Sequence, residues 1–233
     1  MAAPTDARLT RIDAAIVAVW AGLSLFSRRL LGPFPVAADA QTAVTAIVEL
    51  GPGKLIWLPL VFYAGILPLA ILLFHRTFAA RSTPQIRLGS VAGGLGFVLF
   101  AVGLSLNLVE ATTAGAYLAG LPARPDEAIL GRFTLLWRVD QGLAVAVLVC
   151  LAGWMAAVSR AAAVAGLAAW PRWFSAGSVA AAVVTVGAGV WGVISQGALA
   201  AVDGGDALIL VHLWIGLASS LIWQQAGARP GKA

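Results

Sequence analysis

The chain has 233 residues, of which 61% are hydrophobic and only 11% are charged. Soluble domains carry roughly 25% charged residues, and a soluble domain of this length has no way to cover so much apolar surface. The composition therefore excludes an ordinary soluble protein and favours a chain that spans a lipid bilayer. The net charge of +5 does not indicate a nucleic-acid partner, because the basic residues do not form a patch.

Six apolar runs have the length of membrane helices. Each approaches the ~20 residues that a helix needs to cross ~30 Å of hydrocarbon. The runs are continuous, whereas the strands of a membrane barrel alternate over about ten residues. The sequence thus predicts an all-α fold, a single six-helix transmembrane domain over residues 1–233. The predicted helices lie roughly at 13–31, 55–75, 88–110, 133–158, 176–195 and 207–223.

Basic residues are divided unequally between the two sides that six spans define. Because cytoplasmic loops are enriched in Lys and Arg, we expect both termini and Arg81 inside, and Asp126 and Asp203 outside. Arg28 and Arg29 are exceptions, because they are basic residues on the predicted outer side. The pattern predicts a bacterial cytoplasmic (inner) membrane protein, with membrane lipids, especially anionic ones, as partners. The basic residues on the inner side are Arg8, Arg11, Arg76, Arg81, Arg87, Arg160, Arg172, Arg229 and Lys232.

Two connections on the outer side are long, at residues 32–54 and 111–132. The first contains a predicted amphipathic helix, Ala38–Leu50, that Gly51-Pro52-Gly53 ends. Loops of this size are often functional, so we expect them to cap whatever lies on the outer side. In the second predicted helix, Pro68 lacks an N–H group and should kink the helix.

Small residues form a stripe on the third predicted helix. Gly89, Gly96 and Gly103 recur every seven residues, with Gly93 beside them. Small residues let membrane helices approach closely. The stripe therefore predicts a helix contact, for which the fifth predicted helix is the expected partner. The same face continues through Asn107 and Glu110.

Strongly polar residues inside the predicted helices gather toward the outer side. Ionisable groups in a bilayer are costly, so they usually face the interior of the bundle and pair. Three readings stay open: a structural network in which Arg138 pairs with Glu110 or Asp140, a substrate or ion path, and a catalytic or metal site. Glu110 is the expected partner of Arg138, because Asp140 points to a different face of the same helix. The candidate pocket residues are Asn107, Glu110, Arg138, Asp140, Gln141, His212 and Trp214.

The sequence gives little support for a metal site or a cofactor site. His212 with Glu110 and Asp140 provides one imidazole, fewer than zinc hydrolases use, and the chain has no HExxH motif. His75 and His212 should lie ~20 Å apart along the membrane normal, too far to ligate one haem iron. Cys150 is the only cysteine, so neither an intrachain disulfide nor a multi-cysteine zinc site is possible. We predict no metal site or catalytic residue, and the sequence identifies no cofactor.

One motif carries a family resemblance. Pro171-Arg172-Trp173-Phe174 leads into a glycine-containing fifth helix, and Trp214 or Trp223 marks the last helix. In this respect the chain resembles a family of uncharacterised bacterial six-helix membrane proteins with a Pro-Arg-Trp turn before helix five. The resemblance implies a six-helix architecture and no known activity, so it assigns no functional residue.

These observations favour an integral membrane protein with an outward-facing polar pocket and a non-enzymatic role: binding a small molecule or lipid, serving as an accessory subunit of a membrane complex, or transporting a small solute. A homo-oligomer is also open. The alternative is a membrane-embedded enzyme that acts on a lipid or other apolar substrate, with His212 as the acid/base and Arg138 binding an anionic headgroup. The sequence does not decide between them.

Overall fold

The computed structural model describes residues 4–31, 40–57, 59–79, 83–119, 127–166, 170–194 and 204–227. These residues lie in helices and the short turns beside them, so the all-α prediction is confirmed for this part of the chain. The elements are α1 (Pro4–Leu31), α2 (Ala40–Pro52), the π-helical segments η1 (Gly53–Trp57) and η2 (Leu60–Ala64), α3 (Ile66–Phe78), α4 (Thr83–Ala119), α5 (Glu127–Ala165), α6 (Arg172–Ile194) and α7 (Gly204–Gly227).

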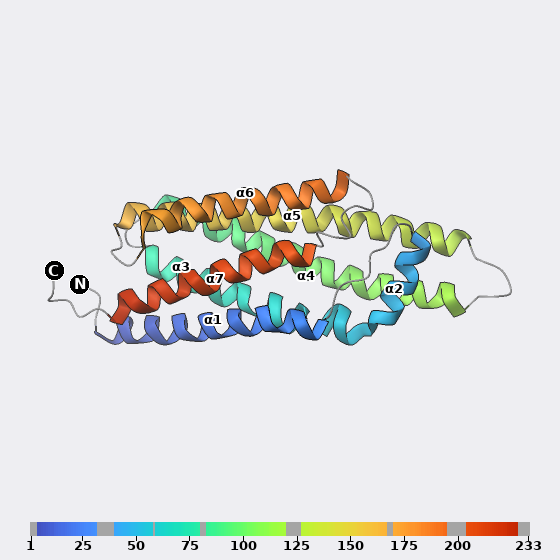
Figure 1. The fold of residues 1–233 in the computed structure, drawn as a ribbon, viewed down its shortest axis with the longest axis horizontal. Coiled ribbons are helices and arrows are strands. Elements are labelled where there is room, and N and C mark those ends of the chain that lie inside the picture. The colour runs from blue at the N-terminus through green and yellow to red at the C-terminus, as the bar shows by residue number, and fades with distance from the viewer. Residues whose placement is uncertain are drawn as a thin grey trace.

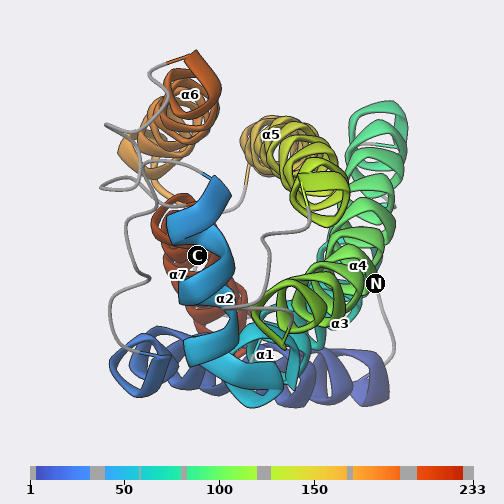
Figure 2. The same ribbon diagram turned by 90° about the vertical axis from the view of Figure 1, so that its right-hand side faces the viewer.

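The long helices run side by side along one axis, and α2 crosses them near one end (Figure 1). The first residues of α1 and the last residues of α7 lie at the opposite end. Seen end on, α7 lies between α1 and α6 (Figure 2). The closest pairs are α4 with α5, α1 with α7, and α5 with α6.

Three of the described helices are long and apolar enough to cross a membrane, at Pro84–Ala119, Glu127–Ala165 and Leu208–Ala226. By the helical rise, the 37 residues of α4 extend ~55 Å and the 39 residues of α5 ~58 Å, well beyond ~30 Å of hydrocarbon. Both helices project past α1, α6 and α7 toward α2 (Figure 1). They are therefore longer than the predicted ranges 88–110 and 133–158.

The projecting ends of α4 and α5 have a small core of their own. Ala114 and Tyr117 of α4 pack with Phe133 of α5 against Ala43 and Val44 of α2. The predicted amphipathic helix is thus present as α2, with its apolar face buried. Its last turn contains Gly51 at φ 67°, a left-handed conformation that glycine adopts readily.

The outward faces of α1 and α4 are apolar. Their exposed side chains recur every three or four residues, which places each set on one helix face. Soluble monomers rarely expose a contiguous apolar patch of more than a few hundred Å². These faces are therefore suited to lipid. They carry Ile12, Ile16, Val19, Leu23 and Phe26 on α1, and Leu88, Val91, Leu95, Val98 and Val102 on α4.

The predicted glycine stripe packs closely against a neighbouring helix. A Cβ on Gly96 would lie 3.0 Å from Cδ2 of Leu151, and a Cβ on Gly93 would lie 3.0 Å from Cγ of Trp154. Both neighbours belong to α5. The prediction of the fifth predicted helix, now α6, as partner is therefore wrong. Consecutive helices usually pack side by side, and α4 and α5 do so, since most of the predicted connection 111–132 belongs to these two helices.

The regular α-helix is interrupted just before Pro68. Within η2, the N–H of Gly65 donates to the carbonyl of Leu60 at 3.0 Å, a bond across five residues. The carbonyl of Val61 accepts a hydrogen bond from the indole Nε1 of Trp20 in α1 at 3.3 Å. A Cβ on Gly65 would lie 2.8 Å from that same carbonyl oxygen, so glycine suits this contact.

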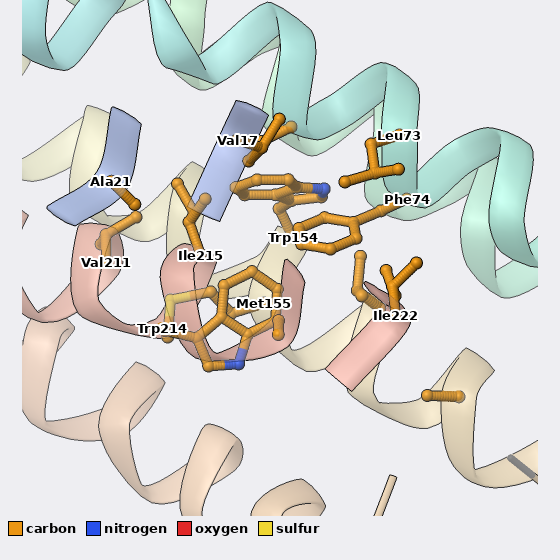
Figure 3. Close-up of a cluster of buried hydrophobic side chains, with 14 of the residues drawn as sticks. Val17, Ala21, Leu73, Phe74, Trp154, Met155, Val211, Trp214, Ile215 and Ile222 are labelled. Carbon is orange, nitrogen blue, oxygen red and sulfur yellow. The ribbon is translucent and has the colours of Figure 1, made fainter. Parts of the chain in front are cut away.

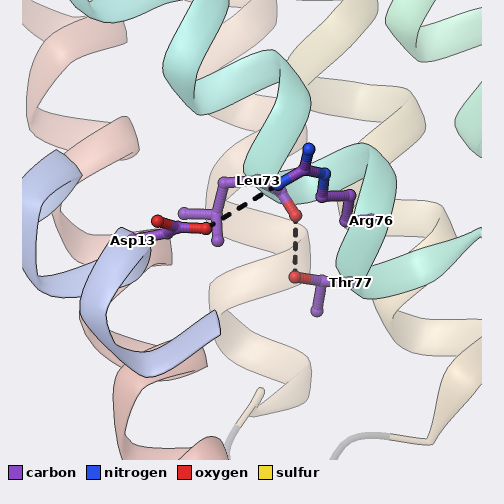
Figure 4. Close-up of polar contacts among 4 residues, drawn as sticks. All are labelled: Asp13, Leu73, Arg76 and Thr77. Atoms are coloured by element: carbon purple, nitrogen blue, oxygen red, sulfur yellow. Dashed lines mark hydrogen bonds and ion pairs between the residues drawn. The ribbon is translucent and has the colours of Figure 1, made fainter. Parts of the chain in front are cut away.

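Polar contacts connect α1 with α3 and α7 at the end where α1 begins. A guanidinium nitrogen of Arg76 lies 4.0 Å from a carboxylate oxygen of Asp13, and Thr77 donates to the carbonyl of Leu73 at 2.7 Å (Figure 4). The guanidinium of Arg11 lies 4.5 Å from the ring centre of Trp223 in α7. Because the ion pair is largely exposed, it contributes about 0–1 kcal/mol to stability.

Candidate functional site

The residues of the predicted outer pocket do not form one cluster. Glu110 and Asp140 lie between α4 and α5, toward α2, whereas His212 and Trp214 belong to the main core between α7 and its neighbours. The side chains of Arg138 and Gln141 are exposed, and that of Asn107 is half-buried one turn before Glu110. The candidate site therefore consists of the two carboxyl groups, which we call the carboxyl pair. His212 and Trp214 lie elsewhere in the bundle.

Glu110 is the most deeply buried carboxyl group that the structure describes. Its side chain is 2% exposed, and its Oε1 has no hydrogen-bond partner among the residues that the structure describes. Ala114 and Tyr117 follow at steps of four and seven residues, so Glu110 shares the α4 face that packs under α2. A buried carboxyl oxygen without a partner is unfavourable by several kcal/mol in an apolar environment, which is why this group marks a candidate site.

Asp140 points from α5 toward α4. Its Oδ1 lies 3.4 Å from the position that a Cβ on Gly103 would occupy, so the missing side chain at Gly103 leaves room for the carboxyl group. Asp140 thus meets α4 at Gly103, about two turns before Glu110 along the same helix. The glycine stripe thus positions an acid as well as packing two helices.

The predicted ion pair between Arg138 and Glu110 is wrong. Arg138 is exposed, and neither carboxyl group of the pair forms an ion pair with a residue that the structure describes. The reason lies in the helix geometry: Arg138 and Asp140 are two residues apart and point to different faces. Because Asp140 faces α4, Arg138 faces away from the bundle.

His212 is fully buried in contacts with the irregular segment before Pro68. Its Nδ1 lies 2.7 Å from the carbonyl oxygen of Leu208, and its ring stands edge-on to Tyr63 with 4.8 Å between the ring centres. Its Nε2 has no hydrogen-bond partner of good geometry in the described part of the chain, although the Tyr63 backbone lies nearby. His212 thus joins α7 to η2 inside the bundle and does not line the carboxyl pair.

Trp214 belongs to an aromatic cluster in the main core. Its ring centre lies 5.4 Å from those of Phe74 and Trp154 (Figure 3). Its indole Nε1 donates to the Oγ of Ser178 in α6 at 2.8 Å, and both groups are buried. Edge-to-face contacts between aromatic rings stabilise packing by about 0.5–1.5 kcal/mol each. Trp214 is therefore placed as a packing residue.

The part of the chain that the structure describes contains no candidate metal site. No group of three or more His, Cys, Asp or Glu side chains there is arranged to hold a metal ion. Cys150 is half-buried, and its Cβ lies 3.2 Å from the position of a Cβ on Gly96. Cys150 therefore contributes to the α4–α5 packing.

Tyr63 was missed by sequence reasoning as the neighbour of His212. A π-helical segment changes the angular spacing of side chains, so the 3.6-residue period does not carry through η2. The sequence likewise gives no sign that Ser178 is the acceptor for the indole of Trp214. No composition signal marked either residue.

The fold and the site define an all-α chain with membrane-compatible helices and a buried carboxyl pair. Comparison with protein-family models, with curated proteins and with solved structures finds no match. The functional assignment therefore rests on the residues themselves.

Proposed function

We propose that the chain is a six-span protein of the bacterial cytoplasmic membrane with both termini inside. The three membrane-compatible helices support this proposal, as do the apolar outward faces of α1 and α4. Charge supports the orientation, because cytoplasmic ends are basic. The end of the bundle where α1 begins is basic: its described charged side chains are Asp13 and the bases Arg11, Arg76, Arg87, Arg160 and Arg172. The α2 end has more acids than bases: its described charged side chains are Lys54, Arg132, Arg138, Glu49, Glu110, Glu127 and Asp140. The resemblance to six-helix bacterial membrane proteins agrees with this topology.

The role that we propose is non-enzymatic: the Glu110–Asp140 pair binds a proton or a monovalent cation on the outer side, in a binding or small-solute transport function. The observation that carries it is the buried Oε1 of Glu110, which has no partner among the described residues, with Asp140 facing the same helix from α5. Two ionised carboxylates repel strongly where the dielectric constant is low. A single positive charge, as a proton on one of the two carboxyl groups or a bound cation, removes that repulsion. Intramembrane carboxyl groups commonly serve ion and proton pathways.

Two further features support a small, singly charged ligand. The pair offers few protein oxygens, whereas Ca²⁺ takes six to eight oxygen ligands. The α2 cover lies directly over the face of α4 that carries Glu110, which would limit access to small species. The enzymatic alternative has no comparable support, because His212 is fully buried away from the carboxyl pair and Arg138 does not face it.

Infrared spectroscopy of the purified full-length protein tests this proposal. We expect a carboxyl band that responds to titration with acid or with sodium ions, that is absent from Glu110→Gln, and that shifts in Asp140→Asn because the two groups interact. Glu127→Gln is the matched control, since Glu127 is an exposed carboxylate at the same end of the bundle.

The same spectra can also contradict the proposed function. A Glu110 band that is insensitive to both acid and sodium, or that is unchanged in Asp140→Asn, would rule out a shared charge on the pair. Loss of the same signal in Glu110→Gln and Glu127→Gln would show that it reports exposed carboxylates. Circular dichroism of each variant would verify that the helices remain folded.

A further inference from the structure

A small pocket with polar groups in its lining lies at the other end of the bundle, between the last turns of α5 and the first turns of α6. Its volume is about 250 Å³, below the roughly 300–1,000 Å³ of sites for drug-sized ligands. A small polar group fits this space better than a whole organic ligand does. The lining residues are Ala156, Ser159, Arg160, Ala163, Ser175 and Val179.

Ser159 gives this pocket an unpartnered hydroxyl group. The residue is 1% exposed, and its Oγ has no hydrogen-bond partner in the described part of the chain. Serines inside helices usually donate to the carbonyl four residues earlier, as Ser178 does to Phe174 at 2.7 Å. Ser159 lacks that bond and lines the pocket, so its O–H has no competing acceptor among the described residues.

Ser175 adds a second hydroxyl group on the opposite wall. Its Oγ accepts a hydrogen bond from the indole Nε1 of Trp170 at 3.1 Å. An oxygen that is already an acceptor still has its own hydrogen to donate. Trp170 thus holds Ser175 in place, and the hydroxyl group of Ser175 can serve a ligand that accepts hydrogen bonds.

Positive charge surrounds the two hydroxyl groups. Arg160 lines the pocket, and Arg172 begins α6 three residues before Ser175, on the same helix face. Both arginines are exposed, and neither pairs with a carboxylate among the residues that the structure describes. The positive N-terminal end of the α6 dipole lies at the same place.

We infer that this pocket binds a phosphate group. Two hydroxyl donors, an unpaired guanidinium and a helix N-terminus are the groups that recognise phosphate oxygens. The donors suit an anion, since the lining residues include no carboxylate. Trp173, 73% exposed and two residues before Ser175 in α6, is the kind of residue that lies at a membrane interface. The phosphate belongs to a lipid headgroup or to a free phosphate compound, and these two sources share the same recognition chemistry.

Native mass spectrometry of the detergent-solubilised full-length protein tests the site. Dioleoyl phosphatidylglycerol is titrated against dioleoylglycerol, which has the same chains without the phosphate. We expect one phosphatidylglycerol to bind more tightly than the rest and more tightly than dioleoylglycerol. Ser159→Ala and Arg160→Gln should each weaken that binding by about tenfold, the loss expected for one hydrogen bond to a charged group. Arg87→Gln is the control, because it removes an exposed arginine at the same end that does not line the pocket.

Inorganic phosphate distinguishes the two sources. If it displaces the tightly bound lipid with the same dependence on Ser159 and Arg160, the site accepts a free phosphate group. If it has no effect while phosphatidylglycerol still binds with that dependence, the phosphate is that of a lipid. Equal binding of phosphatidylglycerol and dioleoylglycerol, or equal losses in Arg160→Gln and Arg87→Gln, would overturn the inference. The test is independent of the carboxyl pair, so its failure would leave the proposed function unchanged.

Discussion

Trp154→Ala is expected to lower the free energy of unfolding by about 3–5 kcal/mol, the range for truncating a buried aromatic residue. Trp154 is fully buried, with its ring centre 5.5 Å from Phe74 and 5.4 Å from Trp214 (Figure 3). In a membrane the loss comes from packing and from the cavity that remains, because lipid is as apolar as the core. Chemical denaturation of the protein in mixed detergent micelles, followed by circular dichroism, measures the change.

Trp173→Ala is the matched control for this prediction. Trp173 is 73% exposed and contacts the ring of Phe174 alone among the aromatic pairs that the structure describes. Its truncation should change the unfolding free energy by less than about 1 kcal/mol. Trp154→Phe should be tolerated better than Trp154→Ala, because it fills most of the space and removes an indole Nε1 that is buried without a partner in the described part of the chain. Equal effects at positions 154 and 173 would contradict the core described above.

Gly96→Leu is expected to destabilise the bundle by about 1–3 kcal/mol through overpacking. The position leaves no room, since a Cβ there would lie 3.0 Å from Cδ2 of Leu151 and 3.2 Å from Cβ of Cys150. Gly94→Leu is the control: Gly94 lies in the same helix, and a Cβ there meets nothing within 4 Å. A thermal-shift assay in detergent should therefore separate the two variants.

A second-site change makes the Gly96 prediction sharper. Leu151→Ala in the Gly96→Leu background should recover part of the lost stability, because it vacates the space that the new side chain needs. Wild-type stability of Gly96→Leu would mean that the glycine face of α4 does not pack against α5. Equal losses in Gly94→Leu and Gly96→Leu would attribute the effect to the removal of glycine from the helix.

The sequence predicted well those features that depend on local pattern. Apolar runs indicated helices, and the small-residue spacing indicated close packing of α4. The turn residues Gly51-Pro52-Gly53 indicated the end of the amphipathic helix α2. These signals arise from the period of one helix and from turn residues, which need no knowledge of neighbours. The end of α4 was predicted too early and the start of α5 too late, because lipid-crossing length set the predicted bounds, whereas both helices continue past it to pack with α2.

The candidate site was predicted only in part, because it depends on helix rotation. Glu110 and Asp140 were both selected, yet the expected partner of Glu110 was Arg138. A choice between Arg138 and Asp140 requires knowing which face of α5 meets α4, and the contact of Asp140 with Gly103 decides this. His212 and Trp214 were grouped with the acids by depth alone, whereas residues at equal depth can lie on opposite sides of a bundle.

The two ends of the bundle have different chemistry. The α2 end holds a buried carboxyl pair that we propose to take up one positive charge, and the opposite end holds donors and arginines that suit a phosphate group. Such a division agrees with the orientation that we propose for the chain in a cytoplasmic membrane. Both assignments rely on the bundle crossing the membrane with its basic end inside.

Cysteine labelling in intact cells tests that orientation most directly. In a Cys150→Ala background, single cysteines at Glu127 and Arg87 report on opposite ends, since both positions are exposed. An impermeant thiol reagent added from outside should modify the cysteine at position 127, and it should modify the cysteine at position 87 only after the membrane is permeabilised. Modification of position 87 but not position 127 in intact cells would contradict the proposed topology, and modification of both would contradict the membrane-spanning arrangement itself.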